Sequence, residues 1–217
     1  MVEQDYQEAR LRMVEEQIRA RRVTDERVLA ALEKVPRHRF VSLAQRGEAY
    51  CDYPLPIGSG QTISQPYVVA LMSELLRLTG EERALEIGTG SGYQAAVLAE
   101  LCREVITVER FPEMAERAQR LLAELGYERI TVIAGDGSLG YEPGAPYDAI
   151  LVTAAAPKIA GPWLTQLADP GRLVLPLGSR YGQSLVRVTK REGRTSEENF
   201  GAVAFVPLVG ENGWDGE

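Results

Sequence analysis

The feature that most constrains the fold is a regular alternation of apolar runs and helical stretches from residue 83 onward. The apolar runs are RALEI (83–87), EVITV (104–108), RITVI (129–133), YDAILV (147–152) and GRLVLPL (171–177). Helical patterns lie between several of them, at 92–101, 112–125 and about 159–168. Strands that alternate with helices are typical of βαβ units, in which helices cover both faces of a parallel sheet.

Two more strand-like runs, SLVRVTK (184–190) and AVAFVPLV (202–209), follow without a helix between them. The polar connection REGRTSEENFG (191–201) predicts that they pair as an antiparallel hairpin. The sequence therefore predicts an α/β fold with a doubly wound, mostly parallel seven-stranded sheet of the Rossmann-like type.

The first eighty residues have a different, helical pattern. Apolar residues recur at three- and four-residue steps, namely Leu11, Val14, Ile18, Val28, Leu29 and Leu32. Thr24 or Asp25 is the expected cap between two helices, and Pro36 ends the second. The stretch 50–66 is too rich in Pro and Gly for a helix or a central strand, and a helix follows at 67–78. We expect a helical cap over 1–80, packed on an α/β domain over 81–217.

Three glycines at alternate positions, Gly88, Gly90 and Gly92, follow the first predicted strand. Such a turn lets a ligand approach the backbone at a helix N-terminus. A phosphate-binding P-loop would need a lysine after the glycines, and none is present. The dinucleotide fingerprint would need glycine where Tyr93 stands, which weakens that alternative. The pattern Glu-x-Gly-x-Gly-x-Gly favours S-adenosylmethionine.

Three acids stand at three successive strand ends, where that cofactor would need them. Glu86 can hold the ammonium of a methionine group, Glu109 can accept both ribose hydroxyls, and Asp136 stands near the expected adenine. An acid at a strand end can also be an ordinary loop cap. All three would lie on the carboxyl edge of one sheet, which favours the cofactor site.

The fourth strand end indicates which group accepts the methyl. VTAAAP (152–157) has no side chain that could hold an amino nitrogen, and no cluster of Asp and Asn suggests a metal. No histidine or lysine stands out as a general base, which suits a carboxylate, already ionised at pH 7. In GQTISQP (60–66), Ser64 or Gln65 is the expected cap of a helix that starts at Pro66. A hydroxyl there would also suit an anionic acceptor.

The charge and the cysteines limit the partners. The net charge is −7, which argues against a nucleic-acid partner, and no run is apolar enough to span a membrane. The two cysteines, Cys51 and Cys102, suit a reduced cytoplasmic protein, with a bridge between them left open. His38 is expected at the surface rather than as a base, and RARR (19–22) on a solvated helix face.

Several of these blocks together resemble the protein L-isoaspartyl (D-aspartyl) O-methyltransferases. They are PLPIGSGQTISQP (54–66), LEIGTGSGYQAAVLAEL (85–101), VERFPEMAERA (108–118), GDG (135–137), DAILVTAAAP (148–157) and FVPLVG (205–210). The resemblance implies a class I methyltransferase domain. It also implies methyl transfer from S-adenosylmethionine to the α-carboxylate of L-isoaspartyl residues in damaged proteins, which begins their repair through a succinimide. We expect a monomer.

The resemblance also implies roles for residues. Ser64 is implied as the active-site residue. The implied cofactor contacts are Thr62, Ile63, Ser64, Glu86, Gly88, Thr89, Gly90, Ser91, Gly92, Glu109, Arg110, Asp136 and Gly137. The implied substrate cleft comprises Tyr53, Pro54, Leu55, Pro56, Ile57, Val206, Pro207 and Leu208, although 206–208 could instead be an apolar edge strand. This chain has Tyr67 where some family members have histidine, so the side chain that closes the methionine pocket stays open.

Three alternatives remain at this stage: an O-methyltransferase for a small carboxylic acid, a non-catalytic regulator that binds S-adenosylmethionine, and a dinucleotide-dependent reductase.

Overall fold

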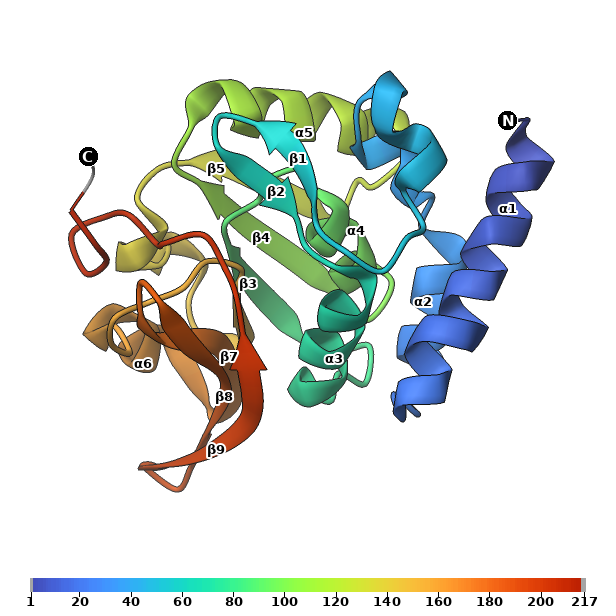
Figure 1. Ribbon diagram of the computed structural model, residues 1–217. Coiled ribbons are helices and arrows are strands. Elements are labelled where there is room, and N and C mark those ends of the chain that lie inside the picture. The colour runs from blue at the N-terminus through green and yellow to red at the C-terminus, as the bar shows by residue number, and fades with distance from the viewer. Residues whose placement is uncertain (1, 216–217) are drawn as a thin grey trace.

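The centre of the molecule is a seven-stranded sheet with strand order β5-β4-β3-β6-β7-β8-β9 (Figure 1). The computed structural model describes residues 2–215. The strands are β3 (Arg83–Ile87), β4 (Glu104–Glu109), β5 (Ile130–Ala134), β6 (Tyr147–Val152), β7 (Leu167–Ser179), β8 (Gly182–Arg191) and β9 (Arg194–Val203). Pairing is parallel from β5 to β7 and antiparallel from β7 to β9. The predicted doubly wound, mostly parallel sheet is confirmed.

Helices cover both faces of the sheet. The α-helices are α1 (Glu3–Arg12), α2 (Glu26–Lys34), α3 (Pro66–Leu76), α4 (Tyr93–Ala99), α5 (Pro112–Glu124) and α6 (Gly161–Gln166). Shorter 3-10 helices span Arg37–Phe40, Leu43–Glu48, Gly137–Leu139 and Glu142–Gly144. Buried residues of α2, α3 and α4 form one core cluster, whereas Trp163 of α6 belongs to a second cluster with the alternate residues of the strands.

The N-terminal helices begin and end at the expected signals. α1 runs on through a π-helical stretch, Met13–Ile18, and a 3-10 turn, Arg19–Arg21. Asp25 caps α2, because its carboxylate accepts the N–H groups of Arg27 and Val28. Leu11 lies in α1, as its spacing predicts, but it is 44% exposed and so does not join the core. In Figure 1, α1 and α2 lie on the side of the molecule away from β9.

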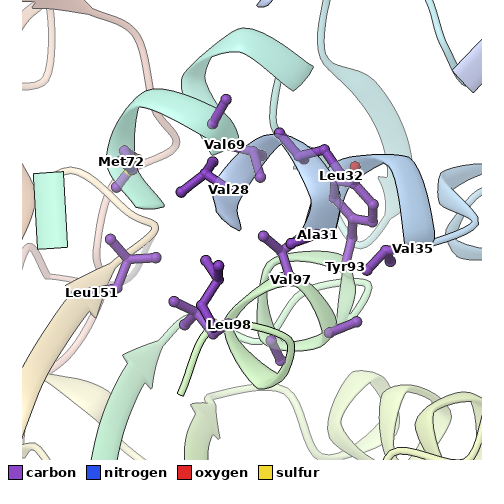
Figure 2. Packing of buried hydrophobic residues seen from close by; sticks show 14 of the residues in the cluster. Val28, Ala31, Leu32, Val35, Val69, Met72, Tyr93, Val97, Leu98 and Leu151 are labelled. Carbon is purple, nitrogen blue, oxygen red and sulfur yellow. The ribbon is translucent and has the colours of Figure 1, made fainter. Parts of the chain in front are cut away.

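The first eighty residues share a core with the sheet. Figure 2 shows Val28 of α2 near Val69 and Met72 of α3, and Leu32 of α2 near Tyr93 of α4. These side chains belong to one buried cluster, which also includes Leu151 of β6. All of these side chains are buried. The cap is therefore held to the sheet by apolar packing, and its treatment as a separate unit ending at residue 80 stays a prediction.

One of two connections differs from the sequence prediction, while the stretch 50–66 forms no strand of the central sheet, as expected. Stretch 50–66 contains a small hairpin, β1 (Leu55–Gly58) and β2 (Gln61–Ile63), apart from the main sheet. Most of the supposed polar connection 191–201 is itself strand β9, and the real turn is Glu192–Gly193, both with positive φ. The antiparallel pairing of β8 and β9 is confirmed, but the final strand ends at Val203.

His38 and the cysteines complete the comparison. His38 is buried, not at the surface as expected; its Nδ1 lies 2.8 Å from the hydroxyl of Tyr50, and its ring stacks on Tyr6. Cys51 and Cys102 are both free, so they form no bridge. Within residues 2–215, no helix is long and apolar enough to cross a bilayer.

Candidate active site

The strand register brings three residues to one level of the carboxyl edge. Ile87 of β3 pairs with Val108 of β4 and with Val152 of β6, so the residues that follow them, Gly88, Glu109 and Thr153, are neighbours in space. In the sheet, β4 and β5 lie on one side of β3, whereas β6 and the later strands lie on the other side, so the strand order reverses at β3. Such a switch point is where doubly wound sheets bind ligands.

The glycine turn serves two purposes. Gly88, Gly90 and Gly92 all have positive φ, at 97°, 54° and 89°. A Cβ on Gly88 would stand 2.3 Å from the hydroxyl oxygen of Thr153, and one on Gly92 would stand 3.3 Å from Leu122. The protein's own side chains therefore fill the space beside these two glycines. Gly88 and Gly90 also line the cavity described below. The absence of side chains in this turn therefore makes room partly for the protein's own residues and partly for a ligand.

Glu109 is buried at the end of β4 and is held by the turn. Its Oε2 accepts the N–H of Gly90 at 2.8 Å, and its Oε1 accepts the N–H of Phe111 at 3.0 Å. A carboxylate has about four acceptor positions, so about two remain for other donors. Glu109 is 5% exposed and lines the cavity described in the next paragraph. A carboxylate with spare acceptor positions therefore forms part of the cavity wall.

A cavity of about 310 Å³ opens above this edge of the sheet. Its walls come from the β1–β2 turn, the ends of β3, β4 and β6, and the segment after β9. The lining residues are Gly60, Gln61, Thr62, Ile87, Gly88, Gly90, Val108, Glu109, Arg110, Phe111, Gly137, Thr153, Ala154, Val206, Pro207, Leu208 and Val209. We call it the cofactor cavity.

Two further cavities adjoin it. A small one of about 40 Å³ lies under the glycine turn and is lined by Thr62, Ile63, Ser64, Val69, Gly88, Thr89, Gly90, Ser91, Tyr93, Gln94 and Thr153. A groove of about 590 Å³ on the other side is lined by Arg21, Pro54, Thr62, Ser64, Gln65, Tyr67, Val68, Leu71, Thr153, Phe200, Ala202, Val203, Ala204, Phe205 and Val206. Thr62 and Thr153 line all three spaces, and Ser64 lines the last two. Below, these two are the small cavity and the groove.

Ser64 is not a helix cap. The N-cap of α3 is Gln65, whose side chain makes no capping bond, while Pro66 takes the first turn as predicted. Of the two expected cap residues, Gln65 is the one at the N-cap position, but the expected side-chain capping bond is missing. The amide of Gln65 binds Asp52, and the carbonyl of Ser64 accepts a hydrogen bond from Arg37. The hydroxyl of Ser64 has no hydrogen-bond partner within the described residues, which leaves it available to a ligand.

Glu86 lies outside the three cavities. It is fully buried in β3, and its Oε2 accepts a hydrogen bond from Thr107, whose hydroxyl also lies 2.7 Å from that of Thr89. Burial raises the pKa of Glu86 to about 8, although the hydrogen bond from Thr107 opposes this. Two hydroxyl groups therefore separate the carboxyl from the small cavity, and its contact with the methionine ammonium stays a prediction.

Asp136 acts as a loop cap, the alternative that its sequence position left open. Its Oδ1 accepts the N–H of Ser138, and its Oδ2 accepts the N–H of Glu211. Burial raises the pKa of Asp136, but these hydrogen bonds and the charge of Arg110 outweigh it, so the pKa is lowered. The next residue, Gly137, lines the cofactor cavity, whereas Asp136 does not.

The predicted substrate residues are divided between different spaces. Pro54 lines the groove, while Pro56 and Ile57 line a separate groove beside α5. Leu55 is buried, and Tyr53 is exposed and donates to Glu48.

The end of the chain lies between the two spaces. Val206 lines both the groove and the cofactor cavity. Pro207 and Leu208 line the cofactor cavity but not the groove. The segment does not form a strand at the sheet edge. Val206 and Leu208 instead hydrogen-bond Ala155 after β6, where the carboxyl ends of the strands separate.

Among the site residues missed at the sequence level, Thr153 and Arg21 have the most specific contacts. Thr153 follows β6, and its hydroxyl donates to the carbonyl of Gly88 at 2.6 Å. Its position at the end of a central parallel strand was the available signal. Arg21 was assigned to a solvated face, yet it lines the groove, pairs with Asp52 and lies 4.0 Å from the ring centroid of Tyr67. The sequence did not indicate this position, because Arg21 is far in sequence from the loop 50–66 that it contacts.

The residues around the cofactor cavity fit S-adenosylmethionine. The spare acceptor positions of Glu109 suit a ribose diol, and Val108, Phe111 and Leu208 provide apolar walls for a base. Thr62, Ser64 and residues of the glycine turn line the small cavity, so hydroxyl and backbone groups are available there for the polar end of the cofactor.

Comparison with known proteins agrees with this geometry. The family model described as Protein-L-isoaspartate(D-aspartate) O-methyltransferase (PCMT) matches residues 8–213. The Protein-L-isoaspartate O-methyltransferase of Methanoculleus marisnigri is 58% identical over 205 residues, which cover 94% of this chain and 93% of that protein.

Solved structures agree as well. A protein-L-isoaspartate O-methyltransferase superposes with a TM-score of 0.84 at 28% identity, over 95% of this chain and 66% of the other. A Plasmodium falciparum protein described as a putative member, solved with S-adenosyl-L-homocysteine, has a TM-score of 0.80 at 24% identity, over 92% and 98% of the two chains. The chain therefore belongs to the protein-L-isoaspartate(D-aspartate) O-methyltransferase family.

Proposed function

We propose that the protein transfers a methyl group from S-adenosyl-L-methionine to the α-carboxylate of L-isoaspartyl and D-aspartyl residues in damaged proteins and peptides. The methyl ester would then close to a succinimide, which begins repair. Membership of the family supports this activity. The supporting feature of this chain is that the three spaces meet at Thr62 and Thr153, with Ser64 lining two of them, the groove and the small cavity.

The chemistry of the junction suits a carboxylate acceptor. When bound, S-adenosyl-L-methionine supplies a methyl group on a positively charged sulfur. A carboxylate oxygen can bond to the methyl carbon while the carbon–sulfur bond breaks, and the neutral thioether leaves without any proton transfer. The described residues that line the three spaces include no histidine, lysine or cysteine. The chain's task is therefore to position an anion and exclude water, not to remove a proton. The free hydroxyl of Ser64 is the donor best placed to orient that anion.

The groove suits a peptide of variable sequence. Most of its walls are apolar or small side chains, and its one charged lining residue, Arg21, is paired with Asp52. Phe200, Ala202 and the segment after them supply one wall from the edge of the sheet. Few side chains there select particular residues, which fits an enzyme that must accept damage in many contexts.

The decisive experiment uses two peptides of identical composition, one with L-isoaspartate and the other with normal aspartate. With labelled S-adenosyl-L-methionine, we expect label in the isoaspartyl peptide alone. Equal labelling of both peptides, or labelling of small carboxylic acids only, would favour the broader O-methyltransferase. Binding of S-adenosyl-L-homocysteine without labelling would favour a non-catalytic regulator.

Ser64→Ala tests the role of the hydroxyl. We expect methyl transfer to slow by about 10²-fold or more, because an oriented donor is lost at the transition state. Binding of S-adenosyl-L-homocysteine, measured by calorimetry, should change little. Full activity of the variant would remove Ser64 from the mechanism.

We further propose that the enzyme works as a monomer in the cytoplasm, on protein rather than nucleic acid. The net charge of −7 supports the choice of partner. Gel filtration with light scattering, with and without peptide, tests the oligomeric state.

A further inference from the structure

Arg37 is a buried cation that the proposed reaction does not yet use. It starts the 3-10 helix Arg37–Phe40, directly after Pro36, and its side chain is 0% exposed. Arginine is almost never fully buried unless it is paired. Burial lowers the pKa of Arg37 to about 10, so the side chain still carries its charge at neutral pH.

The contacts of Arg37 are unusual for a buried arginine. Its Nε donates to the carbonyl of Ala49 at 2.7 Å, and its Nη2 donates to the carbonyl of Ser64 at 2.8 Å. The guanidinium lies over the ring of Tyr93, 4.9 Å from the centroid. Nη1 has no hydrogen-bond partner, and no carboxylate of residues 2–215 forms an ion pair with Arg37.

These contacts join two parts of the active site. Tyr93 begins α4 after the glycine turn and lines the small cavity together with Ser64. Ala49 precedes the loop that leads to Pro54 in the groove. A planar guanidinium donates in two fixed directions, so it sets the position of one carbonyl relative to the other.

We propose that Arg37 is a positioning residue for methyl transfer: it holds the main chain of Ser64 and so fixes the Ser64 hydroxyl where the cofactor and substrate spaces meet. This inference rests on the proposed function, because it assigns Arg37 a role only through Ser64. Core packing alone would not require a charge here, since burying a cation with no counter-ion is unfavourable and an apolar side chain could fill the space.

Charge and geometry predict different kinetic effects. A nearby cation stabilises the acceptor carboxylate most before transfer, when the negative charge is complete, so loss of charge alone would chiefly raise the peptide KM. Loss of geometry would misplace the Ser64 hydroxyl and chiefly lower kcat, since small displacements of a catalytic group slow reactions strongly. Lysine keeps the charge but cannot donate to both carbonyls in the fixed directions of a guanidinium.

The first measurement compares Arg37→Lys with the unmodified enzyme on an isoaspartyl peptide. We expect kcat to fall about tenfold or more, with the Kd for S-adenosyl-L-homocysteine within about twofold. Arg83→Lys is the matched control, because Arg83 also joins a side chain, Glu104, to a backbone carbonyl, that of Gly144, but at the amino end of β3. It should leave kcat unchanged.

The second measurement removes the group that Arg37 is proposed to position. In a Ser64→Ala background, Arg37→Lys should lower the remaining activity by less than about twofold, because no hydroxyl is left to misplace. An equal loss in both backgrounds would overturn the proposal and assign Arg37 a purely structural role. Loss of S-adenosyl-L-homocysteine binding in both Arg37→Lys and Arg37→Gln would also overturn it.

The two proposals fail in different ways. If the unmodified enzyme does not methylate the isoaspartyl peptide, the proposed function fails. If it does, and Ser64→Ala is slow while Arg37→Lys has unchanged kcat, only the positioning role of Arg37 fails.

Discussion

Replacing Glu109 by glutamine changes the cofactor cavity with the least disturbance of shape. The two side chains are nearly equal in size, so the buried end of β4 should keep its packing. The amide has one oxygen where the carboxylate has two, however. One of the two N–H groups that Glu109 now satisfies, Gly90 or Phe111, would then face an NH₂ group. The negative charge at the cavity wall would also be lost.

The expected loss follows from the hydrogen bonds involved. Bonds to a charged group contribute about 1.5–3 kcal/mol each. If the ribose hydroxyls use the two spare acceptor positions of Glu109, the variant's one amide oxygen keeps one of these bonds and the other is lost, so Glu109→Gln should weaken cofactor binding by roughly 1.5–3 kcal/mol. That corresponds to roughly 10- to 150-fold in Kd.

Isothermal titration with S-adenosyl-L-homocysteine measures this directly. Glu104→Gln is the matched control, since Glu104 begins the same strand at the opposite edge of the sheet and pairs with Arg83. It should leave the Kd unchanged. An unchanged Kd for Glu109→Gln, with an unfolding temperature equal to that of the parent, would refute the assignment of Glu109 to the cofactor.

Two further predictions concern the strand β3 and its turn. Gly88→Ala would bring a Cβ within 2.3 Å of Thr153 Oγ1 at a φ of 97°, so we expect a loss of roughly 1–3 kcal/mol in unfolding free energy. Urea titrations measure this loss, and Gly126→Ala is the control, because Gly126 has positive φ but open space around it. Burial holds the pKa of Glu86 near 8 in the folded protein, above its unfolded value, so the native state binds the extra proton and loses stability as pH rises toward and through 8. Glu86→Gln should remove this dependence, gaining up to about 4 kcal/mol relative to the parent between pH 5 and pH 9. Parallel pH profiles of unfolding free energy for the two proteins would contradict it.

The parallel core of the fold could be predicted from the sequence because its signals are local. β3 and β6 have the predicted bounds, and β4, β5 and α5 lie within a residue or two of theirs. β9 could not be predicted, because Arg194–Val203 is mostly polar and exposed and becomes a strand only through pairing with β8. Buried and exposed residues do not alternate along β9, so the sequence lacks the alternation of apolar and polar residues that predicts a strand.

The site was predicted unevenly for a related reason. Glu109 ends β4, and Gly88 and Gly90 follow the end of β3. Strand ends in a parallel sheet meet at a common edge, so these residues could be placed from the sequence. Arg21 reaches the groove only through the packing of the N-terminal helices. Arg37 is harder still, because a charged residue in a short 3-10 turn resembles a surface residue until its burial is known.

The glycine turn has a consequence for relatives of this protein. Gly88 and Gly92 make room for Thr153 and Leu122 of the same chain, independently of any ligand. A descendant that had lost its catalytic activity would still lose stability if Gly88 or Gly92 were replaced, because both positions have positive φ and a neighbouring side chain close by. Retention of Gly88 and Gly92 in a related sequence therefore indicates an intact scaffold and does not by itself indicate activity. Gly90 has Ile57 only at ordinary contact distance, so its positive φ, rather than a neighbouring side chain, favours glycine there.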